Sequence, residues 1–255
     1  MRDLTYPPII LACKTAFRLL GQKIHMTGTE HVPRTGGVLL AVNHVGYADF
    51  VYGGLAANPS GRKVRFMSKR ELFDHRYTGP LMRSMHHIEV DRGAGTASYD
   101  LALDYLKAGE AVGIFPEATI SRAMELKEFK TGAVRIAAAA GVPLVPVVLW
   151  GTQRVKTKDH PRDLSRGTTI LIRVGAPHHP VGVDPVAETA ELRAAMSRML
   201  DEAIAAYPAD EQPPGSWWVP ASHGGSAPTP EEAARLDAEE KVRRAAKRTA
   251  RDEQR

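Results

Sequence analysis

Residues 38–49 read VLLAV-NHVGYAD, an unbroken apolar run followed by a polar turn. Such a run is typical of a strand that helices cover on both faces. A histidine and an aspartate, separated by four residues, follow it directly. In open α/β sheets, functional sites lie where strand ends give way to helices. This stretch therefore predicts a buried strand and the position of a site.

Four further runs rich in β-branched and apolar residues follow along the chain, at residues 64–67, 111–115, 144–149 and 169–174. Helical patterns lie between them. Residues 97–106 and 132–140 run toward Gly109 and Gly141, and a glycine commonly closes a helix at its C-terminus. The alternation predicts an α/β fold, with a mostly parallel central sheet flanked by helices.

The two ends of the chain differ in composition from residues 22–207, which hold this α/β pattern. Residues 1–21 predict an amphipathic helix whose polar face is Lys14, Thr15 and Arg18. Either membrane association or packing on the core accounts for it. A long helix from 185 to 207 is expected to close the domain. Residues 208–230 have the composition of a Pro/Gly/Ser-rich linker, and residues 231–255 that of a charged helical or disordered tail.

Composition restricts the classes of function. The 255 residues carry a formal charge of +5, which favours an anionic partner such as a phosphate-bearing substrate, an anionic membrane surface or nucleic acid. Cys13 is the single cysteine, so no disulfide framework and no cysteine-based zinc site is expected. No apolar run reaches the roughly 18 residues that a membrane-crossing helix needs.

His44 and Asp49 are the strongest candidates for chemistry. On an uninterrupted helix, two residues five positions apart point about 140° away from each other. The two side chains can meet only if the chain bends, and Gly46 permits such a bend. Asp49 would then hold the imidazole tautomer that leaves the other ring nitrogen free as a base. Two unrelated surface residues are the alternative.

Three further blocks also follow apolar runs. Glu117 comes after a strand and is a candidate for hydrogen-bonding an acceptor hydroxyl, with capping of backbone amides as the alternative. Arg92 ends an alternating segment and is suited to pairing with phosphate through its guanidinium fork, with a surface arginine after an edge strand as the alternative. Pro146 lies inside a predicted strand, which indicates an edge strand or a bulge.

Together the four blocks resemble the glycerolipid acyltransferase family, which includes the PlsC-like 1-acylglycerol-3-phosphate (lysophosphatidic acid) acyltransferases. The resemblance covers about residues 23–151. The family's first motif, a histidine and an aspartate separated by four residues after an asparagine, is met by Asn43, His44 and Asp49. The arginine of the second is Arg92, and the fourth, a Val-Pro strand, is matched at residues 142–146.

The third motif, Phe-Pro-Glu-Gly-Thr-Arg-Ser in the family, is met only in part. Ala118 replaces the glycine and Ile120 the arginine. Because the family is thought to hold substrate phosphate partly through that arginine, Arg122 and Lys130 are the substitutes that this chain offers. The resemblance thus implies His44 and Asp49 as catalytic residues and the following as substrate-binding residues: Asn43, Arg92, Glu117, Ala118, Thr119, Ser121, Arg122 and Lys130.

The implied reaction is acyl transfer from acyl-CoA or acyl carrier protein, a co-substrate rather than a cofactor, to a lysophospholipid hydroxyl. The expected acceptor is 1-acylglycerol-3-phosphate and the product phosphatidic acid, made by a peripheral or monotopic protein at the cytoplasmic face of the cell membrane. No metal is expected. Another lipid or glycolipid acceptor and a thioesterase remain alternatives, and a basic nucleic-acid-binding module is a less favoured one because no such signature is present.

Overall fold

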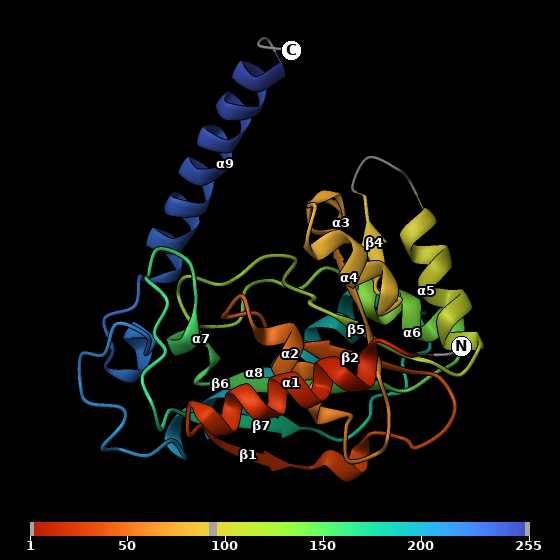
Figure 1. Ribbon diagram of the computed structural model, residues 1–255, viewed down its shortest axis with the longest axis horizontal. Helices are drawn as coiled ribbons and strands as arrows, with labels where there is room; N and C mark the ends of the chain where they lie inside the picture. The colour runs from red at the N-terminus through yellow and green to blue at the C-terminus, as the bar shows by residue number, and fades with distance from the viewer. Residues whose placement is uncertain (1–2, 92–95, 253–255) are drawn as a thin grey trace.

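A central sheet of seven strands organises the computed structural model, which describes residues 3–91 and 96–252 (Figure 1). The strands are β1 (Lys23–Thr27), β2 (Val38–Val42), β3 (Val64–Lys69), β4 (Ile88–Val90), β5 (Ala111–Ile114), β6 (Leu144–Trp150) and β7 (Thr169–Val174). Their order across the sheet is β1-β7-β6-β2-β5-β3-β4, and every adjacent pair is parallel except β6 and β7. The predicted α/β fold with a mostly parallel sheet is confirmed.

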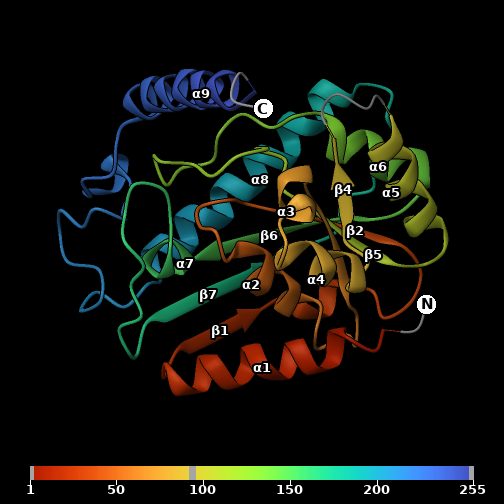
Figure 2. The ribbon, with the colours of Figure 1, turned by 45° about the horizontal axis from the view of Figure 1, so that its top comes forward.

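Helices cover both faces of the sheet. They are α1 (Tyr6–Leu19), α2 (Asp49–Ala56), α3 (Arg70–Asp74), α4 (Thr78–Ser84), α5 (Ala97–Lys107), α6 (Gly132–Ala140), α7 (Thr152–Val155), α8 (Pro185–Ala205) and α9 (Pro230–Asp252). Short 3₁₀ turns are η1 (Thr29–His31) and η2 (Ala221–His223). Figure 2 shows α1 and α8 on opposite sides of the sheet, with α2 on the side of α1.

The apolar run of β2 serves two cores at once. Leu39 and Ala41 pack with side chains from α5, α6 and α8 in one core. Val38, Leu40 and Val42 point the other way, into a second core with α2. Because successive strand residues face opposite sides, a strand buried on both faces needs an unbroken apolar sequence. This explains why β2 could be predicted from its sequence.

β1 was not predicted, and β4 was expected only as the edge strand in the alternative for Arg92. β1 is an edge strand with four of its five residues exposed, so it lacks the apolar run that marks the interior strands. β4 is an edge strand of only three residues. Each edge strand forms by pairing with a longer neighbour: β1 pairs with β7, and β4 pairs with β3. Their own sequences carry little strand signal.

Of the two alternatives for Pro146, the edge strand is wrong. A bulge is present, because between the Leu144–His178 bridge and the Val147–Val174 pair two residues of β6 face three of the opposite segment. β6 lies inside the sheet, parallel to β2 and antiparallel to β7. Proline is tolerated because the β7 ladder starts only at Val147, after an isolated bridge between Leu144 and His178. Pro146 lies in the gap, where its carbonyl accepts from Gly175 N–H at 2.9 Å and a missing N–H costs no ladder bond on that side.

The linker prediction for residues 208–230 is also wrong. Trp218, Val219 and Ala227 are buried in the core that contains α8. Trp218 packs against Trp150 and Tyr207, with ring centroids 5.7 and 5.2 Å apart. Large aromatic side chains bury enough area to hold a segment on the domain despite its turn-forming composition.

α1 packs on the domain, which is one of the two alternatives that its sequence left open. On its inner side the Tyr6 hydroxyl donates to Val64 O at 2.6 Å, and Phe17 stacks on Tyr52. On its outer side Leu11 and Leu19 are 67% and 66% exposed. α1 is therefore packed on the domain and still presents apolar side chains outward. Among the described residues, no helix is long and apolar enough to cross a membrane.

Candidate functional site

His44 and Asp49 meet in the turn between β2 and α2. His44 Nδ1 lies 3.0 Å from Asp49 Oδ2, so the approach expected from a bend of the chain is confirmed. Asp49 is the first residue of α2, and its side chain is fully buried. The His44 side chain remains 20% exposed, and its ring stacks on Phe115 with centroids 4.2 Å apart. One partner is thus shielded and the other reaches the surface.

The Asp49 carboxylate holds the turn closed. Its Oδ2 accepts from the backbone N–H groups of Val45 and Gly46, both at 2.7 Å, and its Oδ1 accepts from Thr152 Oγ1 at 2.6 Å. Because Oδ2 serves these N–H groups as an acceptor, the His44 ring must donate to it from Nδ1. The lone pair of the ring is then on Nε2, as a general base requires.

Gly46 is needed for space rather than for an unusual dihedral angle. A Cβ there would lie 3.0 Å from Thr152 O, 3.1 Å from Lys156 O and 3.2 Å from Asp49 Oδ1. Since real Cβ contacts are rarely this short, a larger residue would push the turn away from α7 and the segment after it. Gly46 was predicted to let the chain bend. Its observed role is to let the bend pack closely against the segment around α7.

Glu117 is not placed to bind an acceptor hydroxyl. Its Oε1 accepts from His44 N–H at 2.7 Å and its Oε2 from Lys127 N–H at 3.0 Å, and the residue is buried. Burial raises the pKa of Glu117 to about 8, against the opposing pull of these two N–H donors. The alternative, capping of backbone amides, is what the structure has. Glu117 positions the His44 backbone.

Asn43 and Ser121 are likewise part of the framework. Asn43 is buried and spans β2 and β6, donating to Leu149 O at 3.1 Å and accepting from Leu149 N–H at 2.7 Å. Ser121 N–H donates to His44 O at 2.8 Å, and the Ser121 hydroxyl is buried. Direct substrate binding by Asn43 is therefore not supported, because both polar groups of its side chain are used inside the sheet.

The remaining residues of the third block line the loop after β5. Ala118 has a φ of 60°, a left-handed conformation that favours glycine, which explains why glycine suits this position in the family motif. Thr119 is half-buried and accepts from Lys158 Nζ at 3.2 Å. Ile120 occupies the position of the arginine in the family motif. Its side chain is buried and apolar, so it does not supply a charge for a substrate.

The three cationic residues predicted to bind phosphate differ in their surroundings. Arg122 is 5% exposed and is surrounded by the carboxylates of Asp159, Asp237 and Glu240. Lys130 is exposed, on the same loop. Arg92 lies outside the described residues.

A hollow lined by Arg193, Leu200 and neighbouring residues lies beside α8, and its lining includes neither His44 nor Asp49.

Comparison with known proteins places this chain in a family. The family model described as Acyltransferase matches residues 23–150, which contain both His44 and Asp49. The chain belongs to this acyltransferase family. The family resemblance of the four sequence blocks is thereby confirmed, and the acyltransferase is an O-acyltransferase by the names of its relatives.

Individual relatives agree with the assignment. A 1-acyl-sn-glycerol-3-phosphate acyltransferase of Bacillus subtilis is 30% identical over 198 residues, covering 75% of the acyltransferase and 93% of the relative. Another from Borreliella burgdorferi is 29% identical over 155 residues, covering 58% and 60% of the two chains. The crystal structure of the PlsC acyltransferase from Thermotoga maritima has a TM-score of 0.66 at 23% identity, covering 79% and 80%, and so shares the fold.

Sequence reasoning missed several residues around the site of the acyltransferase. Thr152 holds the second oxygen of Asp49, and Thr157 Oγ1 donates to Val45 O at 2.6 Å. Lys127 and Lys158 approach the same loops. These residues lie far along the chain from His44, on α7 and in loops, and no local pattern distinguishes them from ordinary polar surface residues.

Proposed function

We propose that this acyltransferase moves a fatty acyl group from a thioester carrier to a free hydroxyl of 1-acylglycerol-3-phosphate, producing phosphatidic acid. The observation that carries the proposal is the 3.0 Å contact between His44 Nδ1 and the buried Asp49 carboxylate. This contact fixes the tautomer of a partly exposed histidine, as a base requires, at the end of a parallel strand. Two relatives named 1-acyl-sn-glycerol-3-phosphate acyltransferase support the choice of acceptor.

In the proposed mechanism, His44 Nε2 takes the proton of the acceptor hydroxyl while the hydroxyl oxygen attacks the thioester carbonyl carbon. A C–O bond forms, and collapse of the tetrahedral intermediate breaks the C–S bond. The imidazolium then returns the proton to the leaving thiolate. Asp49 stabilises the imidazolium through its charge, and Glu117 holds the His44 backbone in place. No covalent acyl-enzyme is required.

The decisive experiment is an assay of the purified protein with a panel of lysolipids, read by mass spectrometry. Acyl-CoA and acyl carrier protein are supplied in separate reactions, because either carrier presents the same thioester. We expect phosphatidic acid from 1-acylglycerol-3-phosphate. Release of free fatty acid at the same rate with and without lysolipid would identify a thioesterase instead.

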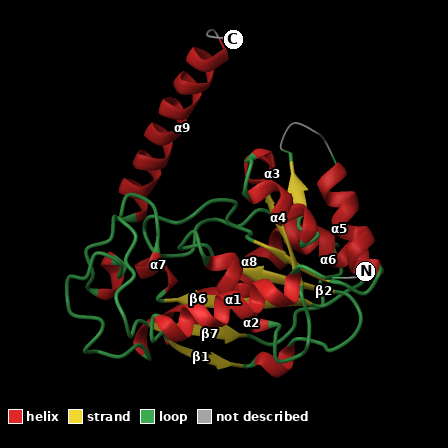
Figure 3. Ribbon diagram, viewed as in Figure 1, coloured by secondary structure: helices red, strands yellow, loops and turns green. Residues whose placement is uncertain are grey.

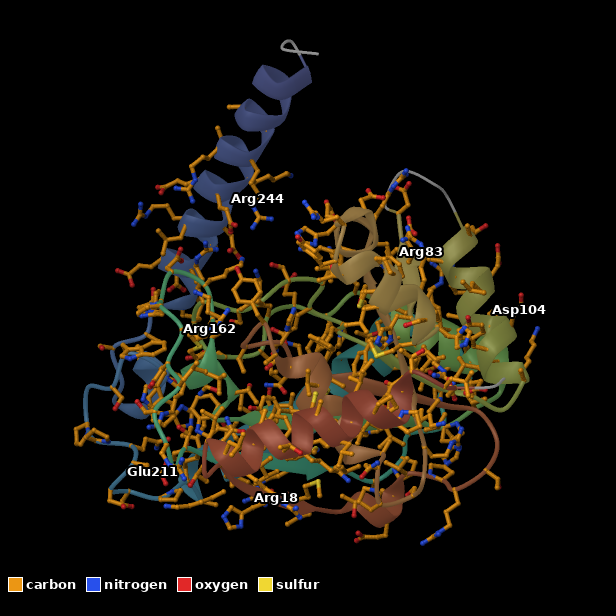
Figure 4. All side chains as sticks on the ribbon, in the orientation of Figure 1. Arg18, Arg83, Asp104, Arg162, Glu211 and Arg244 are labelled. Atoms are coloured by element: carbon orange, nitrogen blue, oxygen red, sulfur yellow. The ribbon has the colours of Figure 1, made fainter. Side chains whose placement is uncertain are left out.

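We further propose that α1 attaches the protein to the cytoplasmic face of the membrane, where its lipid acceptor resides. The outer face of α1 carries the exposed residues Leu11, Arg18 and Leu19 (Figure 4 labels Arg18). Lys14 is exposed at the flank of the helix, where its Nζ donates to Asn58 Oδ1 of the domain. Leucine side chains can enter the acyl boundary while lysine and arginine contact anionic headgroups. This combination suits a helix that lies in the interface rather than one that crosses it.

Replacing Leu11 and Leu19 by aspartate is expected to lower binding to anionic vesicles by about tenfold or more, because two leucines that would enter the bilayer are lost and two repelling charges are gained. Vesicle flotation measures it. Substitution is a cleaner test than deleting α1, which would also remove Tyr6 from its buried site. The matched control places aspartate at Val183, just before α8, and at Val186, in its first turn, which are 87% and 71% exposed. Equal flotation of both variants would contradict the proposal.

A further inference from the structure

Three cationic side chains converge on one carboxylate of α9. Arg122 Nη1 and Lys158 Nζ contact Asp237 Oδ1, the latter at 2.9 Å, and Lys127 Nζ contacts Asp237 Oδ2. Glu240, one turn further along α9, accepts from Arg122 Nη2 at 2.9 Å and lies 3.3 Å from Lys158 Nζ. Arg122 is almost completely buried, so this is a built anion site rather than a chance surface pairing.

The same three cations are anchored to the loop that carries His44. Ser121, next to Arg122, donates its N–H to His44 O, and Lys127 N–H shares the Glu117 carboxylate with His44 N–H. Thr157, next to Lys158, donates to the carbonyl of Val45. Each cation is therefore one or two hydrogen-bonded steps from the catalytic turn. An anion held there lies at the border of the proposed active site.

α9 contacts the domain through these charges. Figures 1 and 3 show it extending away from the sheet layers, attached near its N-terminal end. In the described part of the chain, the ion pairs between α9 and the domain all end on Asp237 or Glu240. Burial opposes ionisation of Glu240, but Arg122 and Lys158 hold its pKa at about 2. Within residues 230–246 of α9, Ala233 is the buried apolar residue.

We propose that Arg122, Lys127 and Lys158 form the binding site for a phosphate group of a substrate, and that α9 covers this site with Asp237 and Glu240 until phosphate displaces them. Asp159, on Arg122 Nε at 2.6 Å, is the carboxylate outside α9 that pairs with the cluster. Without α9, three cations and one carboxylate remain, and the two uncompensated positive charges match a phosphate monoester dianion. The inference rests on the proposed acyl transfer, which supplies phosphate-bearing substrates.

The test compares two full-length variants of equal charge. Asp237→Asn/Glu240→Gln removes the two carboxylates of α9 that pair with Arg122, Lys127 and Lys158. Glu231→Gln/Glu239→Gln removes two charges from the same helix at positions away from these cations. Binding of inorganic phosphate, followed by calorimetry, is expected to tighten by about fivefold or more in the first variant, because the open fraction of the site rises. The control variant should bind as the wild type does. Equal affinity in all three proteins, or equal tightening in both variants, would overturn the proposal.

Amide hydrogen exchange of α9 in the unaltered protein gives a second measure that needs no variant. Phosphate should speed exchange along the first turns of α9, compared with chloride at the same ionic strength. Neither measurement needs catalysis, so both remain informative in His44→Ala protein if the acyl-transfer proposal fails.

Kinetics then identify which substrate carries the phosphate. A lower KM for 1-acylglycerol-3-phosphate in Asp237→Asn/Glu240→Gln assigns the site to the acceptor, and a lower KM for acyl-CoA alone assigns it to the donor. Unchanged KM for both substrates would overturn the role of the cluster in substrate binding.

Discussion

Replacing His44 by alanine is expected to lower kcat for acyl transfer by about 10²–10⁴-fold, the range in which a positioned general base contributes. The KM for both substrates should change little, because the imidazole acts on the proton that moves in the transition state. The measurement is steady-state acyl transfer to 1-acylglycerol-3-phosphate, with product quantified by mass spectrometry.

His25→Ala is the matched control, since His25 is exposed on the edge strand β1 and plays no part in the site. Thermal unfolding of both variants should resemble that of the wild type, because the His44 side chain is partly exposed and Asp49 keeps its two backbone donors. A folded His44→Ala protein that retained wild-type turnover would exclude His44 as the base.

Replacing Asp49 by asparagine is expected to lower kcat by about 10²–10⁴-fold while leaving the protein folded. The amide oxygen can still accept from Val45 and Gly46, and the amide nitrogen can face the Thr152 hydroxyl, which is able to accept. What the variant loses is the negative charge that stabilises the imidazolium. Steady-state kinetics and a urea unfolding curve together separate this loss from a loss of structure.

Thr152→Val provides the comparison for Asp49→Asn. It removes a single hydrogen bond to Asp49 Oδ1 and retains the charge, so its kcat should fall by no more than about tenfold. If the two substitutions reduced kcat equally, the carboxylate would act only through the geometry of the turn. The electrostatic part of the mechanism would then be wrong.

Much of the framework could be predicted because its signals are local. Interior strands such as β2 are apolar at every position, since both faces are covered. α6 ends where Gly141 adopts a φ of 64°, as its C-terminal glycine predicted. The His44 and Asp49 pair was predictable for the same reason, because five residues and one glycine determine whether the two side chains can meet.

Roles that depend on partners distant in the chain could not be predicted. Glu117 has the residue type and position of a substrate ligand, yet both of its oxygens hold backbone amides. A proline within a strand is typical of an edge position, yet Pro146 lies in the interior strand β6. It lies between the Leu144–His178 bridge and the ladder that starts at Val147. Arg122 was predicted to bind phosphate, and no local pattern indicated that α9 would supply carboxylates to it.

By itself, the amino-acid sequence determined the α/β class, the interior strands, the helix ends and the turn that joins His44 to Asp49. Each of these follows from periodicity or spacing within about a dozen residues, where backbone geometry leaves few choices. Only the tertiary structure decided that Trp218, Val219 and Ala227 of the segment after α8 pack in the core. It also decided that Thr152 and Glu117 brace the turn that carries His44, and that α9 pairs its carboxylates with Arg122. Those arrangements are contacts between segments far apart in the chain, and such contacts form only when the packing of the whole domain brings their partners together.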